Sequence, residues 1–596
     1  MARSGAGAKT QSHIITAKMN ANPSQIGVSA ADRIGRPALW LIVVAALVAF
    51  IVLGQGITAP FQKDAEPQSA QWVQSVARGH LTAPRDYYGY LVEKPLLYYW
   101  LSGAATRLMG GKTTEVSARI VPLLAGTALA IEVLLWTAEN LGAAQGWLAF
   151  LFLIATYGYS SRATLALTDM LMTFLVISTL LILYPQLEGS ESRVRTVGAI
   201  VVLQLAVMTK GPIAAILTGL AILTFLVITG RNPLALLRER WIWILAIAVT
   251  AMTVGWYWLW FTLGTWKIFP IFMTENFGHF LPAKYGGTGE AARPIWYILA
   301  RLVGGAMPIV LLLPAAIAGF VTGEIEAARR RPLAFAASLA IAVIVFFSLA
   351  SAKRDDYILP ALPGVAILCA CVFALNEPTA GRAHWALRLR TAAVITIALA
   401  MLAALAAGIA LAITHAHVGL HLQSSDADEL ALYVRGFAMM RLGYLTFALA
   451  VIAGAIAASI GLVRRNAILA GAAAGLLTLS GSMLANAILR PALAWERSAK
   501  TFAFIVHEQI GAAPIFVVRD PNYDFSFYYG TEAPPLMGRH RQAPLPGVQS
   551  YLVANDAERN ALAPQYRDCL KLIVKSHLVA HDGPLALYAI ASEPAH

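Results

Sequence analysis

The sequence predicts a polytopic α-helical membrane protein with a small α/β domain at its C-terminal end. Apolar residues make up 58% of the 596-residue chain, and the mean hydropathy is +0.64. Soluble domains are less apolar than this, and uninterrupted apolar runs recur up to residue 490. Beyond that residue the runs shorten to the length of strands. The chain therefore divides into a membrane part and a soluble part.

About thirteen apolar runs approach the roughly 20 residues that a helix needs to cross a bilayer. The segment Lys210-Gly211-Pro212 separates two short runs, and a Gly-Pro pair favours a tight turn, so we count two spans there. The predicted spans are 38–57, 118–138, 144–160, 164–185, 196–209, 212–230, 241–263, 296–321, 333–350, 357–375, 391–413, 438–463 and 467–490.

Basic residues between the spans predict the orientation, because cytoplasmic loops of membrane proteins are rich in Lys and Arg. With the N-terminus in the cytoplasm, every second loop carries arginines except the loop near 139–143. The first loop (57–118), the 264–295 and 351–356 loops and everything after 490 then lie outside the cytoplasm. The arginines of the predicted cytoplasmic loops are Arg193, Arg195, Arg231, Arg238, Arg240, Arg329, Arg330, Arg331, Arg382, Arg388, Arg390, Arg464 and Arg465.

Composition also excludes several classes of function. Residues 1–36 are rich in Gly, Ala, Ser and Asn without an apolar stripe, which predicts a disordered cytoplasmic tail rather than a cleaved signal peptide. The net charge of +13 comes from loop clusters that act as topology signals, so we expect no nucleic-acid partner. Cys369 and Cys371 share one apolar run and Cys569 lies far away, which argues against a disulfide framework or a thiolate metal site.

Residues 491–596 are predicted to form the soluble α/β domain on the outer side. Strand-length apolar runs at 515–518, 550–554 and 585–591 alternate with helix-like patterns. The segment contains no nucleotide-binding loop, catalytic serine motif or metal-binding cluster. We therefore expect a structural or acceptor-facing role.

Ionisable residues are concentrated in the first outer loop, although only 13% of the whole chain is charged. Among several Trp and Tyr residues, the loop contains the charged residues Asp64, Glu66, Arg85, Asp86, Glu93 and Lys94. Charges beside a bilayer are costly and are usually functional, so this pattern indicates a reaction site at the membrane surface. The aromatic run after Pro95 favours a helix that lies in the interface.

Later outer loops and span ends add further ionisable groups. Carboxylates and cations around one outer cavity suit transfer from a lipid phosphate, because a carboxylate can deprotonate the attacking hydroxyl while cations or a metal stabilise the leaving phosphate. Spacing alone does not separate transfer from transport, so a secondary transporter or lipid flippase is the alternative, although no internal repeat is visible. The added residues are Asp169, Lys210, Lys267, Glu275, His279, Lys284, Lys353, Arg354 and Tyr357.

The order of several short motifs resembles the polytopic GT-C glycosyltransferases. After an aspartate at 64 come GHLTAPR, YLVEKPLLYYW, SAR, LTDM, TKGP and SAKRDDYILPALPG, within roughly residues 38–375. The nearest branch holds the lipid A aminoarabinose transferases and bacterial relatives of the protein O-mannosyltransferases. The resemblance implies a GT-C domain over 37–490 of a bacterial inner-membrane protein. It further implies inverting transfer of a sugar from a polyprenyl-phosphate donor to a periplasmic lipid, glycan or protein.

Matching motifs also imply roles for single residues. Asp64 is the expected catalytic base, with Glu93 and Asp169 as further catalytic acids, and Lys94 is expected to hold the carrier phosphate. A divalent metal ion is an open expectation, with Glu93 and His279 as its ligands. The other residues expected to bind substrate are Arg85, Tyr88, Lys210, Lys353, Arg354 and Tyr357.

Four positions depart from the family pattern. Ala65 and Pro67 stand where an acid and an arginine are usual, Leu96 replaces the second proline of EKPP, and Asn276 interrupts an E-H-x-x-R pattern. These departures leave the sugar, the acceptor and the metal open.

Overall fold

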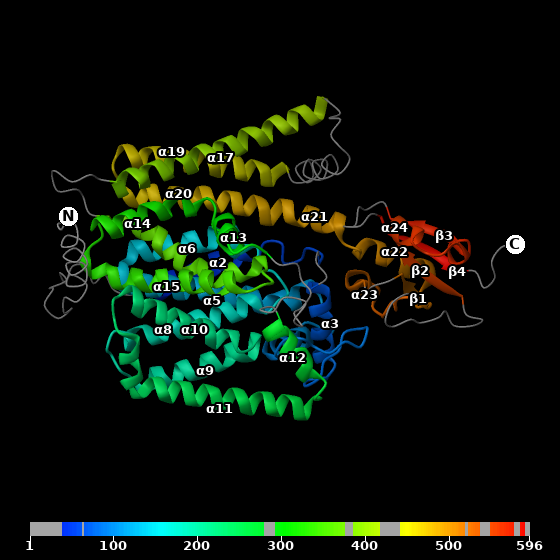
Figure 1. The fold of residues 1–596 in the computed structure, drawn as a ribbon. Coiled ribbons are helices and arrows are strands. Elements are labelled where there is room, and N and C mark those ends of the chain that lie inside the picture. Colours follow the sequence, from blue (N-terminus) through cyan, green and yellow to red (C-terminus); the bar gives the residue numbers. More distant parts are fainter. Residues whose placement is uncertain are drawn as a thin grey trace, which may run out of the picture.

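A computed structural model describes residues 38–61, 65–278, 293–375, 385–417, 441–518, 522–536, 549–576 and 584–590. These residues form a bundle of long helices with a small domain at one end (Figure 1). Eight helices in the described part are long and apolar enough to cross a membrane, or nine if one bent pair counts as a span. The predicted polytopic helical fold is confirmed. The predicted tail 1–36, Asp64 and His279 lie outside the described residues.

Each predicted span coincides with one helix or with two or three consecutive helical segments. Three of the helices are apolar but short, and α9 carries charges at both of its ends. The helices of the bundle are α2 (Leu39–Leu53), α5 (Glu115–Leu141), α6 (Ala143–Ala155), α8 (Asp169–Leu187), α9 (Arg193–Lys210), α10 (Ile213–Ile228), α11 (Arg240–Leu263), α13 (Tyr297–Gly305), η5 (Ile309–Leu312), α14 (Leu313–Thr322), α15 (Ala327–Leu349), η6 (Asp355–Ala361), α16 (Leu362–Cys371), η7 (Val372–Ala374), α17 (Trp385–His417), α19 (Arg441–Val463) and α20 (Ala467–Met483).

The predicted span 296–321 is not one straight helix. Helix α13 and the segment Ile309–Thr322 meet at 102°. The bend follows Gly304 and Gly305 and contains Pro308, which donates no backbone hydrogen bond, so the helical ladder is broken there. The bend leaves α13 packed against η6 rather than continuing the line of α14.

The predicted span 164–185 also begins later than expected. Helix α6 ends at Ala155, a single turn α7 (Tyr157–Ser160) follows, and α8 starts at Asp169. The chain between α7 and α8 forms turns instead of a helix. Asp169 is therefore the first residue of its helix.

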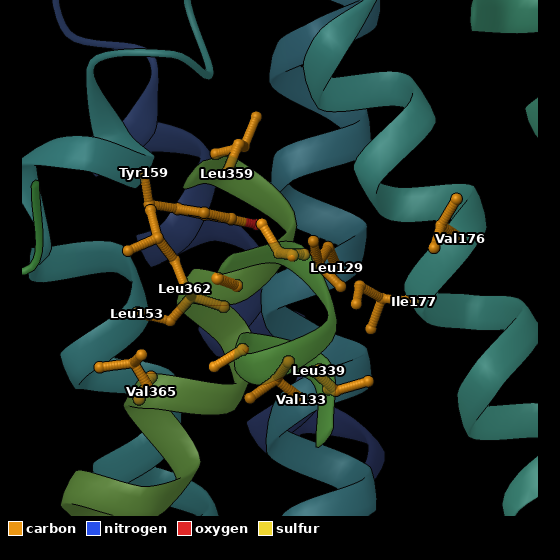
Figure 2. Packing of buried hydrophobic residues seen from close by; sticks show 14 of the residues in the cluster. Leu129, Val133, Leu153, Tyr159, Val176, Ile177, Leu339, Leu359, Leu362 and Val365 are labelled. Carbon is orange, nitrogen blue, oxygen red and sulfur yellow. The ribbon is translucent and has the colours of Figure 1, made fainter. Parts of the chain in front are cut away.

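Helices α5 and α7 are in close contact in the middle of the bundle. Tyr159 Oη donates a hydrogen bond to Gly126 O at 2.6 Å and so joins α7 to α5. Helices in a bilayer associate through such close contacts, because lipid offers no hydrophobic driving force between them. Figure 2 shows the buried side chains around this contact: Leu129, Val133, Leu153, Val176, Ile177, Leu339, Leu359, Leu362 and Val365.

Two helices stand in the first loop. Helix α4 (Leu97–Leu108) starts after Pro95, where an interfacial helix is predicted. Helix α3 (Ala65–Ala77) was not expected, because its sequence has no clear apolar stripe. It buries Trp72, Val73 and Val76 in the hydrophobic core and also buries the polar side chains of Glu66 and Gln71, so apolar packing and polar contacts together hold it in place.

The C-terminal domain contains a four-stranded sheet in the order β1-β2-β4-β3. Strand β1 (Ile515–Val517) is parallel to β2 (Ser550–Ala554), and β4 (Ala586–Ile590) is antiparallel to its neighbours. Three strands lie where the sequence predicts them. The edge strand β3 (Leu570–Lys575) was missed because its lysines and exposed apolar residues mask a strand pattern.

Helix α20 leads from the bundle into this domain. It continues through the π-helical segment η8 (Leu484–Leu489) into α21 (Arg490–Arg497). In Figure 1 the domain lies beyond the end of the bundle that carries α3 and α12 (Ile268–Phe277). The remaining helices of the described chain are η2 (Pro233–Arg238), α22 (Lys500–Ile510), α23 (Tyr523–Tyr529), α24 (Asp556–Asn560) and α25 (Pro564–Arg567).

Candidate active site

A small cavity opens where α9, α10, α12 and η6 meet. Three residues predicted to bind substrate, Lys94, Lys210 and Tyr357, take part in its lining. They come from the loop before α4, from the end of α9 and from η6, so the fold joins segments far apart in sequence. The complete lining is Lys94, Lys210, Ile213, Glu275, Asn276, Phe347, Ala350 and Tyr357.

Lys210, which lines the cavity, forms an ion pair with Asp169. Asp169 starts α8 and Lys210 ends α9, so each charge lies at the helix end whose dipole stabilises it. The Lys210 ammonium also lies 5.4 Å from the ring centre of Tyr357, which stacks on Phe347 at 4.2 Å. Asp169 and Lys210, two of the predicted site residues, are therefore in direct contact.

Gly211 makes the turn that brings α12 against the end of α9. Its φ is +92°, a conformation that residues with a Cβ rarely adopt. An added Cβ would lie only 2.3 Å from Asn276 Oδ1. The tight turn predicted at Lys210-Gly211-Pro212 is confirmed, and the glycine allows Asn276 to approach the backbone.

Lys94 forms an ion pair with Glu275 of α12. These two residues are 181 positions apart in the chain, and their contact joins the first loop to the 264–295 loop. Burial raises the pKa of the neighbouring Glu93 above the ordinary value, and the negative charge of Glu275 raises it further. The carboxylates of Glu93 and Glu275 therefore both lie near the ammonium group of Lys94.

The predicted cations at the start of η6 have different surroundings. The Lys353 ammonium donates to Arg293 O at 2.9 Å and to Ala350 O, and the residue is 8% exposed. Arg354 is more exposed and lies 3.8 Å from Asp356, which also pairs with Arg162 at 3.1 Å. Lys353 thus holds backbone in place, whereas Arg354 remains accessible at the edge of the site.

Arg85 and Tyr88 lie outside the cavity lining. Arg85 is exposed and donates to Gly89 O at 2.6 Å, which closes a turn. Tyr88 packs under α23, where its hydroxyl contacts Ser526. Both residues order the loop that leads to Lys94.

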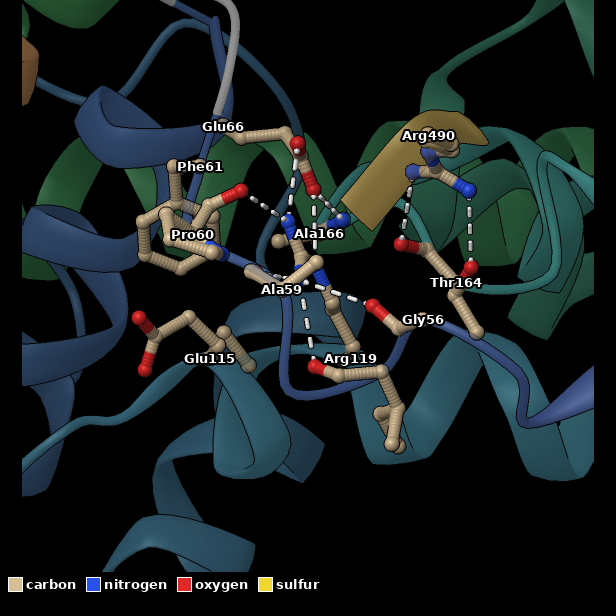
Figure 3. Close-up of polar contacts among 12 residues, drawn as sticks. Gly56, Ala59, Pro60, Phe61, Glu66, Glu115, Arg119, Thr164, Ala166 and Arg490 are labelled. Carbon is tan, nitrogen blue, oxygen red and sulfur yellow. Dashed lines mark hydrogen bonds and ion pairs between the residues drawn. The ribbon is translucent and has the colours of Figure 1, made fainter. Parts of the chain in front are cut away.

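The sequence reasoning missed a buried ion pair between Arg119 and Glu66 (Figure 3). Arg119 Nε and Nη2 lie 3.0 and 3.1 Å from the two carboxylate oxygens of Glu66. The residues are 1% and 2% exposed. Burial alone would raise the pKa of Glu66, but Arg119 outweighs it and holds that pKa below the ordinary value. An arginine at the start of an apolar helix signals the need for such a partner.

This pair anchors two stretches of chain. Arg119 donates to the carbonyls of Ile57 at 3.1 Å and of Ala59, and Glu66 accepts from Ala166 N at 2.9 Å. Ala166 belongs to the turns that lead into Asp169. The ion pair therefore fixes the approach to α8 as well as the chain after α2.

Metal ligands are sparse in the part of the chain that the structure describes. No group of three or more His, Cys, Asp or Glu side chains gathers there in a metal-binding arrangement. Glu93 and Glu275 supply neighbouring carboxylates, and the expected ligand His279 lies outside this part. The described residues thus provide at most a partial set of ligands.

The fold can be compared with solved structures. Crystal structures of ArnT from Cupriavidus metallidurans in the apo state and bound to undecaprenyl phosphate both match with a TM-score of 0.69 at 19% identity. The apo match covers 92% of this chain and 97% of that chain, and the second match covers 94% and 99%. The chain has the ArnT fold. The predicted GT-C fold is thereby confirmed.

Sequence relatives agree with the ArnT fold. A family model described as dolichyl-phosphate-mannose-protein mannosyltransferase matches residues 93–259, which include Lys94, Asp169 and Lys210. The undecaprenyl phosphate-alpha-4-amino-4-deoxy-L-arabinose arabinosyl transferase of Enterobacter sp. (strain 638) is 26% identical to this chain, over 47% of this chain and 49% of that protein. The transferase of the same name from Erwinia tasmaniensis is 27% identical, over 54% of this chain and 56% of that protein. The chain spans about half the length of the curated relatives it matches. The predicted resemblance to the aminoarabinose transferases is confirmed.

Proposed function

We propose that this protein transfers a sugar from a polyprenyl-phosphate donor to an acceptor at the outer face of a bacterial inner membrane. The observation that carries the proposal is the convergence of Lys94 and Lys210 on one cavity. Ammonium groups bind phosphate oxygens through strong charge-assisted hydrogen bonds. The ArnT fold supports the proposal, because one structure with that fold is bound to undecaprenyl phosphate.

Binding of the donor exchanges one set of ion pairs for another. In the cavity, Lys94 is paired with Glu275 and Lys210 with Asp169. An incoming phosphate takes over part of the hydrogen bonding of both ammonium groups. The side chains are largely shielded from water, so the attraction between lysine and phosphate is stronger than at an open surface.

In the proposed reaction, the hydroxyl oxygen of the acceptor attacks C1 of the sugar from the face opposite the phosphate. A bond forms between that oxygen and C1, the bond between C1 and the phosphate oxygen breaks, and configuration at C1 inverts. The hydroxyl proton passes to the Asp64 carboxylate, which acts as general base. The polyprenyl phosphate departs with the bonding electrons, and Lys94 and Lys210 stabilise the added negative charge.

Other residues of the proposal act around this centre. Asp169 orients Lys210, Glu93 lies beside Lys94, and Tyr357 supports Lys210 through its ring. Arg354 adds positive charge, since its field reaches both Glu93 and Asp169. Arg85, Tyr88 and Lys353 order the surrounding backbone through the contacts described above.

A divalent metal ion is a further proposal, with Glu93 and His279 as its ligands. Such an ion, when bound, neutralises negative charge on the phosphate. Glu93 fits this role in part, because a nearby carboxylate disfavours its ionised form and a cation would relieve that repulsion. The steps above involve the side chains alone.

The proposed orientation places the N-terminus in the cytoplasm and the C-terminal domain in the periplasm, as the arginine-rich loops predict. The acceptor is then a periplasmic lipid such as lipid A, another glycan or a protein. The relatives are named for 4-amino-4-deoxy-L-arabinose, so a donor carrying this sugar is the first to assay. Their names describe transferases and give no support to a transporter.

Mass spectrometry of the envelope tests the proposal. A deletion strain is expected to lose one sugar mass from a lipid, glycan or protein, and the wild-type gene is expected to restore it. A Lys94→Met, Lys210→Met double variant that inserts normally is expected not to restore it. An unchanged envelope, together with accumulation of a labelled solute in vesicles, would replace the transferase with a transporter.

A further inference from the structure

Helix α23 of the C-terminal domain is bonded directly to the chain that follows α2. Tyr528 Oη accepts a hydrogen bond from Phe61 N at 2.9 Å and donates one to Glu115 Oε1 at 3.0 Å. Phe61 also packs edge-on against Phe527, with ring centres 5.1 Å apart. Glu115 is further paired with Lys500 at 2.6 Å. The domain is therefore joined to the first loop by polar and aromatic contacts together.

Phe61 stands at a sensitive place in the chain. Phe61 lies three residues before the proposed base Asp64, and Glu66 lies two residues after Asp64. Arg119 holds Glu66 from the side of the bundle, and Tyr528 holds Phe61 from the side of the domain (Figure 3 shows Phe61, Glu66 and Arg119). Phe61 and Glu66, the described residues that flank the segment with Asp64, are thus each held by a partner.

A second set of contacts reaches the turn that leads to Lys94. Gln68 Nε2 donates to Asp86 Oδ2 at 3.1 Å and to Tyr523 Oη at 3.0 Å, so it links α23 to this turn. Asp86 Oδ1 accepts from the backbone amides of Tyr88 and Tyr90 at 3.0 and 2.8 Å. Asp86 is 5% exposed, so these bonds are shielded from water.

We propose that helix α23 is part of the catalytic apparatus, with Tyr528 and Tyr523 as positioning residues. Tyr528 positions the chain before Asp64, and Tyr523 positions the turn before Glu93 and Lys94 through Gln68. This inference rests on the proposed function and assigns the C-terminal domain a role in the reaction itself. In this role the two tyrosines of the domain fix the groups of the first loop and do not react themselves.

The first test uses Tyr528→Phe in the full-length protein, because this change removes the hydroxyl and keeps the ring against Phe61. We expect kcat per folded molecule to fall about tenfold, because the change removes both hydrogen bonds of the hydroxyl and leaves the chain before Asp64 less precisely placed. The Kd of undecaprenyl phosphate should remain within about twofold, since Lys94 and Lys210 are untouched. Tyr566→Phe is the matched control, because Tyr566 belongs to the same domain and is 58% exposed.

The second test asks whether Tyr523 acts through Gln68. Tyr523→Phe is expected to lower kcat in the wild-type background but to have no further effect in a Gln68→Leu background, because the bond is then already lost. Equal effects of Tyr523→Phe in both backgrounds would overturn the proposed link. This pair also decides the question if Tyr528→Phe fails to fold.

Two outcomes must be kept apart. If the variants lower Tm but leave kcat per folded molecule unchanged, α23 only stabilises the fold and the inference is wrong. If the wild-type protein transfers no sugar from any polyprenyl-phosphate donor, the proposed function fails instead.

Discussion

Lys210, at the end of α9, lines the cavity and donates a hydrogen bond to Asp169, at the start of α8. Lys94, the other lysine of the lining, is held in the same way by Glu275. Each ammonium therefore has a carboxylate partner before any donor arrives. Such pairs keep the cations in place and avoid unpaired charge in a shielded site.

If Lys94 and Lys210 bind the donor phosphate, their loss should strongly weaken the affinity for undecaprenyl phosphate. Lys94→Met and Lys210→Met should each weaken the affinity for undecaprenyl phosphate about tenfold to a hundredfold, since each removes a charge-assisted hydrogen bond. Lys112→Met, an exposed lysine of the same loop, is the control and should have no effect. Titration of the purified protein with the lipid measures the affinities. Equal affinities in all three variants would remove the lysines from the phosphate site.

Loss of Arg119 is expected to destabilise the whole protein. Arg119→Met leaves Glu66 buried without its counter-ion, which costs about 3–5 kcal/mol in the free energy of unfolding. Lys575→Met is the comparison, because its ion pair with Asp556 is exposed and is worth about 0–1 kcal/mol. Chemical unfolding in mixed micelles measures both. A cost for Arg119→Met no larger than that for Lys575→Met would contradict the anchoring role.

Gly211 should tolerate no side chain. Gly211→Ala places a methyl group against Asn276 and forces a strained φ, so we expect a lower Tm and lost transfer activity. Gly219→Ala in α10 is the matched control, because the added methyl group meets no described atom within 4 Å. That change should leave Tm equal or slightly higher, since alanine favours helix over glycine. Equal behaviour of the two variants would show that the turn is not constrained.

The raised pKa of Glu93 predicts a pH-dependent stability difference. Its folded pKa lies above the ordinary 4.5, so the folded protein disfavours the ionised form, and stability is lost as pH rises through the folded value. Glu93→Gln should match the wild-type Tm below pH 4.5 and exceed it at neutral pH. Thermal unfolding across this range measures the difference. A Tm difference that is constant with pH would mean that Glu93 titrates normally.

Much of the membrane architecture could be predicted because it depends on local pattern. Apolar runs mark the helices, and Gly211-Pro212 marks a turn, since both signals lie in neighbouring residues of the sequence. The bend after α13 was missed, although Gly304, Gly305 and Pro308 were visible in the sequence. A run of apolar residues does not tell a straight span from a broken one.

The partners of the site residues could not be predicted. The motifs pointed to Lys94 and Asp169, and both lie at the cavity end of the bundle. Glu275 is 181 residues from Lys94, and Tyr528 is 467 residues from Phe61, so no local spacing connects them. Such pairings depend on how the helices pack, and the packing cannot be read from a single sequence.

The most direct test of the account measures transfer by the purified protein and by Asp64→Asn in lipid nanodiscs. The substrates are an undecaprenyl-phosphate sugar and an envelope lipid acceptor, and mass spectrometry quantifies both products. The account predicts one undecaprenyl phosphate released for each acceptor glycosylated by the wild-type protein. For Asp64→Asn it predicts unchanged binding of undecaprenyl phosphate and a rate lower by about 10²–10⁴. Transfer by Asp64→Asn at the wild-type rate would contradict the account.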